Sequence, residues 1–238
     1  MHIHLPKPLH GWRELLGEVG VIVIGVLIAL GAEQIVQAVH QNLEARQAED
    51  NVRSELEFNL GRLQSRMQTR MCVDRRIAEM QTLIDGASSQ LNILPPNWIG
   101  RPQYWTLHYS SWEAEAQAGR AALINQEMLP QYGILYALMH NVEGEMAVEQ
   151  ADWARLRMLE HLHRLDQPTL FEISAALQDA RYRSWRVVLV TSELFDFARR
   201  SRLRPAPNNS PASRSVCLSM TTTREAADRT SALPFGNP

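Results

Sequence analysis

Residues 19–32 read VGVIVIGVLIALGA, which is 14 consecutive positions without a charged side chain. A helix that crosses a bilayer needs about 20 mostly apolar residues, so a span must also take in neighbouring positions. Those neighbours include Glu18 and Glu33, and a carboxylate is tolerated near the interface, where water reaches it. Trp12 lies just before the run, as aromatic interface anchors do. We therefore predict a transmembrane helix over residues 15–36.

Two other interpretations of this stretch stay open. A cleaved signal peptide would explain the small residues Ala29 and Gly31, which are spaced as at a cleavage site. Against it, Glu18 interrupts the approach to the apolar run, and the basic segment before it is thin. The stretch could also be a core helix of a soluble protein or, because it is rich in Val and Ile, a central strand.

Small residues gather on one face of the expected span. Gly25, Ala29 and Ala32 follow helical spacing, and a small-xxx-small pair lets two helix backbones approach closely. This pattern predicts a homo-oligomer formed through the membrane helix. Gly and Ala are common in any spanning helix, which is the alternative explanation.

The basic residues around the span indicate its orientation. Lys7 and Arg13 precede it, whereas Arg46 is the one basic residue over the comparable stretch that follows. Because cytoplasmic flanks carry the excess of Lys and Arg, this bias favours a cytoplasmic N-terminus at residues 1–14. The remaining chain would then be extracytoplasmic (periplasmic), anchored in the cell inner membrane with the lipid bilayer as its first partner.

Residues 12–34, WRELLGEVGVIVIGVLIALGAEQ, carry a resemblance to known proteins. They resemble the opening of uncharacterised bacterial single-pass membrane proteins, which are families of unknown function. Those proteins share an aromatic or basic lead, a Glu in the first turn, and a Val/Ile/Gly run ending in Leu-Ile-Ala-Leu. Residues 112–119 and 132–136 are similar to a Trp…Gly…Tyr pattern of the same families. The resemblance implies a membrane anchor and brings no activity, because those families have no assigned function.

Apolar residues recur every three or four positions after the span, which predicts that the helix runs on as a long amphipathic helix. A break is expected between Glu44 and Arg53, where the pattern is weakest, and a stop at Asp85 and Gly86. Residues 86–109 contain several Pro residues and are expected to form a loop.

Three further helices are expected beyond that loop. A capping box at Ser110 opens a short helix to about Asn125, and Pro130 fits the first turn of a long helix ending near Asp166. A second capping box at Thr169 opens a last helix to about Leu203, although residues 185–191, WRVVLVT, could instead form a strand.

The fold class is therefore all-α: a transmembrane helix continues into a long amphipathic helix that packs with about three further helices. The extramembrane bundle covers residues 37–204, and the 45% apolar composition of the whole chain allows a sizeable core. Residues 205–238 are rich in Pro, Ser, Asn and Thr, which predicts a flexible or extended tail.

The chain has two cysteines, Cys72 and Cys217, and neither lies in a Cys-x-x-Cys motif. They can form a disulfide if the domain faces an oxidising compartment, and the bond would pin the tail to the long amphipathic helix. Two unrelated buried thiols are the alternative.

Motifs for chemistry are weak. Glu160 and His163 have the spacing of half a di-iron site, but the second Glu-x-x-His that such a site needs does not occur. His140 and Glu143 lack the His-Glu-x-x-His context of a zinc protease. We therefore predict no enzyme activity, no cofactor and no metal site. Three more histidines precede the anchor, at His2, His4 and His10.

Charge also limits the function classes. The formal net charge is -2, which argues against a nucleic-acid binder that relies on bulk electrostatics. The densest basic run is Arg199, Arg200, Arg202 and Arg204. This run fits either contact with anionic headgroups or an acidic partner, or the negative end of a helix dipole.

Together these features predict a membrane-anchored helical structural or interaction module whose protein partner is unknown. The alternative is an extracytoplasmic, sensor-like bundle that binds a ligand and acts through a partner protein. A metal-dependent enzyme is the third and weakest hypothesis, because it rests on one Glu-x-x-His.

Overall fold

The computed structural model describes residues 11–90, 92–208 and 213–231, and this part of the chain is all-α, as predicted. It forms no strand there, apart from an isolated bridge between Asn92 and Arg164. The helices in chain order are α1 (Gly11–Met67), α2 (Arg70–Gln90), α3 (Ser110–Gln117), η1 (Arg120–Leu123), α4 (Leu129–Leu156), η2 (Arg157–Glu160), α5 (Gln167–Arg200), η3 (Ser215–Cys217) and α6 (Arg224–Ser231).

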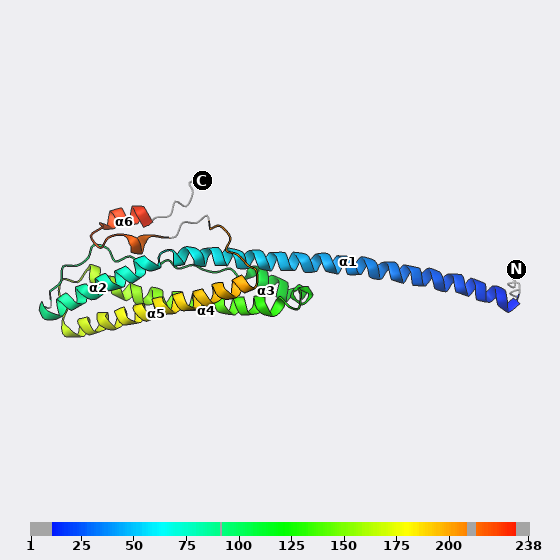
Figure 1. Ribbon diagram of the computed structural model, residues 1–238, viewed down its shortest axis with the longest axis horizontal. Helices are drawn as coiled ribbons and strands as arrows, with labels where there is room; N and C mark the ends of the chain where they lie inside the picture. The colour runs from blue at the N-terminus through cyan, green and yellow to red at the C-terminus, as the bar shows by residue number, and fades with distance from the viewer. Residues whose placement is uncertain (1–10, 91, 209–212, 232–238) are drawn as a thin grey trace, which may run out of the picture.

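Helix α1 is one unbroken rod with two different surfaces (Figure 1). Its first half stands clear of the bundle, and its large apolar side chains from Leu16 to Leu43 are exposed. From Ala48 onward one face turns inward, and its apolar side chains are fully buried at the spacing of a helix: Val52, Leu56, Leu60 and Leu63. The expected break between Glu44 and Arg53 is wrong, because Ala48 and Val52 already belong to this core face.

A turn at Gln68 and Thr69 separates α1 from α2. Thr69 is buried there, and its hydroxyl donates to the Arg66 carbonyl at 2.9 Å, which satisfies one carbonyl at the end of α1. Helix α2 continues past the expected stop at Gly86 to Gln90. A helical Gly costs about 1 kcal/mol relative to Ala, and the buried Ile84 and Ala87 beside it offset that cost.

Helices α4 and α5 run antiparallel along the bundle, and α1 and α2 lie beside them (Figure 1). The core forms two clusters. The first joins α1, α4 and the second half of α5, and the second joins α2, the end of α4 and the first half of α5. Residues 185–191 lie within α5, so the strand alternative for them is wrong.

Two helix starts differ from the capping boxes read in the sequence. Ser110 is the first residue of α3 rather than its cap, and Glu55 of α1 accepts the N–H groups of Ser111 at 2.8 Å and Trp112 at 3.3 Å. The cap of α5 is Asp166, whose side chain accepts the Thr169 N–H at 3.0 Å. A carboxylate satisfies the unpaired N–H groups of a helix start from either position.

Three expected helix ends are also corrected. The short helix α3 ends at Gln117, and a 3₁₀ helix, η1, covers part of the stretch to Asn125. Helix α4 ends at Leu156, where η2 takes over, instead of near Asp166. Helix α5 ends at Arg200, where Arg202 adopts a left-handed φ of 58° that a helix cannot continue.

A buried ion pair ties α1 to α4. Nη2 of Arg66 donates to both carboxylate oxygens of Glu149 at 2.9 Å, and both side chains are almost completely buried. Burial raises the pKa of Glu149, and the Arg66 charge opposes that shift. Because either charge alone would be costly at this depth, the two helices must stay in this register.

Composition predicts a flexible or extended tail over residues 205–238, and the described part of that tail packs on the bundle. Ala206 donates its N–H to the Glu57 carbonyl at 2.8 Å, and its backbone lies against Gly61, where a side chain would collide with it. Further along, η3 and α6 bury Val216 and Ala227.

Candidate functional site

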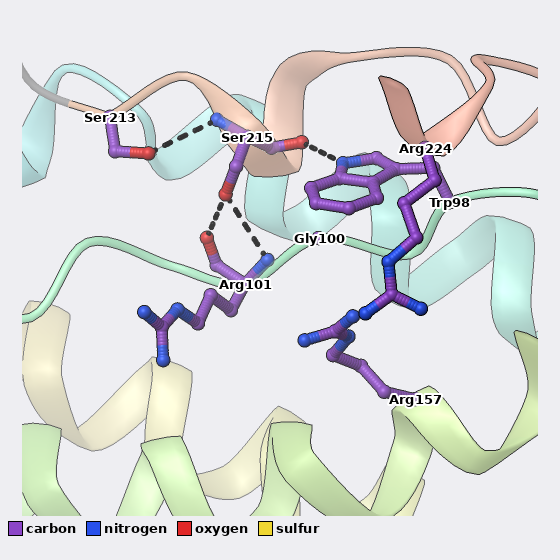
Figure 2. A pocket seen from close by; sticks show the side chains of 7 residues that line it. All are labelled: Trp98, Gly100, Arg101, Arg157, Ser213, Ser215 and Arg224. Atoms are coloured by element: carbon purple, nitrogen blue, oxygen red, sulfur yellow. Dashed lines mark hydrogen bonds between the residues drawn. The ribbon is translucent and has the colours of Figure 1, made fainter. Parts of the chain in front are cut away.

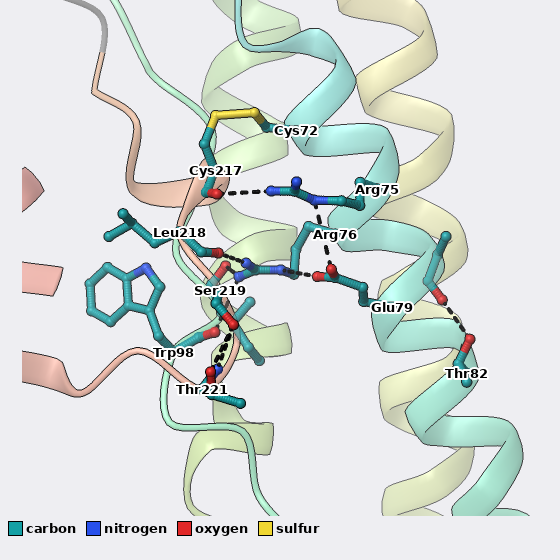
Figure 3. Close-up of polar contacts among 12 residues, drawn as sticks. Cys72, Arg75, Arg76, Glu79, Thr82, Trp98, Cys217, Leu218, Ser219 and Thr221 are labelled. Carbon is teal, nitrogen blue, oxygen red and sulfur yellow. Dashed lines mark hydrogen bonds and ion pairs between the residues drawn. A yellow bond between two sulfur atoms is a disulfide. The ribbon is translucent and has the colours of Figure 1, made fainter.

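A disulfide joins the tail to the second helix (Figure 3). It connects Cys72 of α2 with Cys217 of η3, whose Cα atoms are 4.8 Å apart. Beside it, Arg75 donates to the Cys217 carbonyl at 2.8 Å. The bond closes a loop of 145 positions, and cross-links over long loops typically stabilise a fold by about 2–4 kcal/mol. This clamp fixes one wall of the site described below.

Arg76 is a fully buried cation at the junction of loop and tail (Figure 3). Its guanidinium donates to the carbonyls of Trp98 and Ile99 in the loop after α2, and to the carbonyl of Leu218 in the tail. Its Nε pairs with Glu79 at 2.8 Å. Burial lowers the pKa of Arg76, and the hydrogen bond to Glu79 opposes that shift. One side chain of α2 therefore holds two irregular segments together.

The loop and the tail also bond directly to each other. Trp98 Nε1 donates to the Ser215 carbonyl at 2.8 Å, and the Ser215 hydroxyl donates to the Arg101 carbonyl at 2.9 Å. Between them lies Gly100, with a φ of 72° that favours glycine. A Cβ atom at Gly100 would lie 2.5 Å from the Ser215 carbonyl oxygen, so glycine is also needed for this close approach.

These segments enclose a cavity of about 290 Å³ next to η2, which we call the arginine pocket (Figure 2). Three of its lining residues are arginines and two are serines. The lining consists of Trp98, Gly100, Arg101, Arg157, Ser213, Ser215 and Arg224.

The charges of the arginine pocket are largely uncompensated. Arg101 and Arg224 are exposed and form no ion pair within the described residues. Arg157 pairs with Glu160 at 3.1 Å and lies over the Trp98 ring, 5.5 Å from its centroid. The Glu160 carboxylate is only 4% exposed, and it also accepts the Ile99 N–H at 2.9 Å. The pocket can therefore attract an anion, since arginine forks bind carboxylate and phosphate oxygens.

The residues expected to pack two membrane helices together lie on the exposed half of α1. Gly25, Ala29 and Ala32 follow one another at helical spacing there, and a Cβ atom at Gly25 would meet nothing within 4 Å. A single chain offers them no packing partner in the described residues, so self-association stays a prediction.

The Glu and His residues weighed as metal ligands have structural contacts. Glu160 belongs to the pair with Arg157, and His163 is exposed. His140 stacks on the Tyr109 ring, 3.9 Å between centroids, and Glu143 accepts the Tyr109 hydroxyl at 2.7 Å. Burial, with Glu143 adding to it, raises the pKa of Tyr109. The N-terminal residues His2, His4 and His10 lie outside the described residues.

The arginine run ends α5, at the end of the bundle nearer the exposed half of α1 (Figure 1). Arg199 pairs with Asp196, and the Arg202 carbonyl accepts a hydrogen bond from Arg53 at 2.8 Å. Arg199 keeps a cation at the C-terminal end of α5, where it complements the helix dipole. Arg53 satisfies a backbone carbonyl just beyond that end.

Sequence reasoning missed the arginine pocket. Its residues come from four segments that are distant in the chain, and none forms a motif. Two signals were present in the sequence. Residues 215–220, SVCLSM, form a brief apolar patch around Cys217 that marks a packed tail segment, and Gly100 lies among aromatic residues.

Comparisons of the chain with protein-family models, with curated proteins and with solved structures give no match. The resemblance of residues 12–34 to bacterial membrane anchors therefore stays a prediction, and a functional proposal for this chain has to rest on its own geometry.

Replacing Gly100 with Ala should loosen the junction of loop and tail. The left-handed φ and the collision with the Ser215 carbonyl both oppose a Cβ atom, so we expect a loss of about 1–3 kcal/mol in unfolding free energy. Urea unfolding of the full chain in detergent measures it. The same change at Gly144, which is exposed within α4 and has open space around it, should instead stabilise by about 0.5–1 kcal/mol. Equal stabilities of the two variants would contradict the assignment.

Proposed function

We propose that this chain is a single-pass protein of the cell inner membrane, anchored by α1, whose helical bundle acts outside the cytoplasm as an interaction module. The observation that carries the proposal is the exposed apolar half of α1. Among the described residues, one helix is long and apolar enough to cross a membrane, and it begins with the first half of α1. None of its apolar stretch is buried. A signal sequence would share this apolarity but would be cleaved from the mature chain, whereas an anchor keeps the chain in the membrane.

The free energy of that exposed surface supports lipid as its environment. Val21 is 73% exposed and Ile28 is 67% exposed, and the residues between them are exposed too. Apolar surface left in water costs about 25 cal/mol per Å², and soluble proteins rarely display a continuous patch of this extent. A helix of about 20 residues is 30 Å long, which matches the hydrocarbon core of a bilayer.

A mostly exposed helical segment lies between the expected span and the bundle. Residues 37–47 follow the expected span, and Ala48 is the first residue after it whose side chain is buried against the bundle. At a rise of 1.5 Å per residue this segment holds the bundle roughly 16 Å from the span. A domain held away from the bilayer on a rigid helix is well placed to meet other molecules.

The disulfide supports an extracytoplasmic domain. Cytoplasmic thiols are kept reduced, whereas a disulfide persists in an oxidising compartment such as the periplasm. The Cys72–Cys217 bond therefore agrees with the orientation expected from Lys7 and Arg13 before the span.

An exposed apolar stripe on α5 supports contact with a partner protein. Phe171, which is 79% exposed, shares the outer face of the helix with Tyr182, Trp185 and Leu189. The stripe lies opposite the buried face that includes Ile173, Ala180 and Leu194. Aromatic residues of this kind are enriched at protein interfaces.

A second candidate function, a ligand-binding bundle that acts through a partner, is favoured by the arginine pocket.

Arginine in the middle of the span should abolish anchoring. Each Arg at the centre of a membrane helix opposes insertion by about 3 kcal/mol, so Ile24→Arg with Leu27→Arg should leave the protein outside the membrane fraction after an alkaline wash. The control places the same two arginines at Leu43 and Gln47, which are exposed on α1 beyond the span. That control should stay in the membrane fraction. Release of the wild-type chain by the wash would refute the anchor.

The disulfide makes the orientation measurable. In wild-type protein from its native membrane, denatured without reductant, a maleimide should label neither cysteine, because Cys72 and Cys217 are bonded. The Cys72→Ser variant leaves Cys217 free and serves as the positive control. Labelling of both wild-type cysteines without reductant would contradict the disulfide and remove its support for an extracytoplasmic domain.

Leucine at the small residues of the span should weaken self-association. Gly25→Leu with Ala29→Leu would keep two backbones apart, so we expect the dimer captured by crosslinking in membranes to fall several-fold. Gly20→Leu with Gly31→Leu adds the same bulk on the other side of the helix and should leave the dimer intact. Equal crosslinking of the two variants would exclude this face as the interface.

A further inference from the structure

We propose that the arginine pocket binds a small, soluble molecule that carries a phosphate group, held between Arg157 and Arg224. This site goes beyond the anchoring and interaction roles proposed above, and its binding chemistry does not depend on them.

The two guanidinium groups face each other across the pocket (Figure 2). Arg224 has no acidic partner among the described residues. Arg157 uses Nε and Nη2 on Glu160, which leaves its Nη1 donors without a described partner. The Arg224 charge therefore stands uncompensated beside the Arg157–Glu160 pair, and an anion between the two guanidinium groups would neutralise it and satisfy the free donors.

Charge and donor geometry select phosphate over a single carboxylate. A phosphate monoester carries about −1.5 to −2 charges at neutral pH and offers three acceptor oxygens. The three arginines of the lining, less the one charge that Glu160 neutralises, leave two net positive charges that match the phosphate, whereas one carboxylate would neutralise only one of them. The unpartnered Nη1 of Arg157 and the Arg224 guanidinium can each donate to a separate oxygen of one phosphate.

The size of the pocket limits the ligand to a small molecule. The cavity of about 290 Å³ lies at the lower end of the range for ligand sites. Its walls are already in place, because the disulfide, Arg76 and Ser215 fix the tail against the loop. Little ordering would accompany binding, which favours affinity for a small anion.

The position of the pocket indicates a soluble source of phosphate rather than a lipid headgroup. Arg76, which bonds to the pocket wall at Trp98, lies 40 positions beyond Val36 at the end of the expected span, or roughly 60 Å along the helical rise. The tail elements η3 and α6 lie at the end of the molecule far from the start of α1 (Figure 1). This step alone rests on the proposed anchor, since headgroups would be out of reach only if the span is where we propose.

Calorimetric titration of the full, oxidised chain in detergent with inorganic phosphate, at constant ionic strength, tests the site. We expect saturable binding with one phosphate per chain. Arg224→Gln should weaken the affinity about tenfold or more, because it removes a charge-assisted contact. The matched control is Arg229→Gln, which removes the same charge from an exposed position on α6 outside the pocket lining and should change the affinity less than about twofold.

Two outcomes overturn the site: no saturable binding by the wild type, or equal losses in Arg224→Gln and Arg229→Gln. A second arm tests the source, using the chain in nanodiscs of phosphatidylcholine with or without phosphatidylglycerol. Unchanged phosphate affinity supports a soluble ligand, and competition by phosphatidylglycerol overturns that part. Because the detergent titration needs neither insertion nor a particular orientation, failure of the pocket and failure of the anchor would be seen in different experiments.

Discussion

The solvent requirement of α1 governs the rest of the architecture. Within this one continuous helix, residues 19–32 are apolar on all sides, whereas from Ala48 onward the buried apolar residues lie on one face. A helix that is apolar all round must be surrounded, whereas a helix with one apolar face needs only neighbours on that side. The bundle of α4 and α5 therefore assembles on the second half of α1 and leaves the first half for another environment. No helix of the described bundle covers the first half, and that asymmetry underlies the proposed location and everything inferred from it.

Polar side chains on α1 and α2 position both neighbouring helices and the irregular loop and tail. Glu55 caps α3, Arg66 fixes α4 through Glu149, and Arg76 gathers the carbonyls of the loop and the tail. A long loop loses much conformational entropy when it is ordered, and charged hydrogen bonds to its backbone offset part of that loss. The arginine pocket exists because the tail is held in this way, and it is bounded by backbone that Gly100 allows to approach closely.

The sequence predicts the helices because their apolar periodicity is a local property. The stripe from Val52 to Leu63 and the exposed run before Leu43 can both be read from spacing alone. The helix starts were less predictable, since Glu55 caps α3 from 55 positions away in place of the local box at Ser110. The break expected between Glu44 and Arg53 is wrong because the core face begins within that stretch, at Ala48 and Val52, and the polar residues beside them lie on other faces of the same helix. The arginine pocket was beyond prediction, because its charges meet only through the tertiary contacts of Arg76 and the disulfide.

The long separation of the two bonded cysteines affects how the molecule would respond to proteolysis. Its two cysteines enclose α3, α4 and α5 in one covalent ring. If a protease cut the chain once inside that ring, in a connection such as residues 157–166, the fragments would stay joined through sulfur. Release of the bundle from α1 would require reduction of the disulfide or cleavage before Cys72. A chain cut once inside the ring would therefore keep its bundle attached to the anchor.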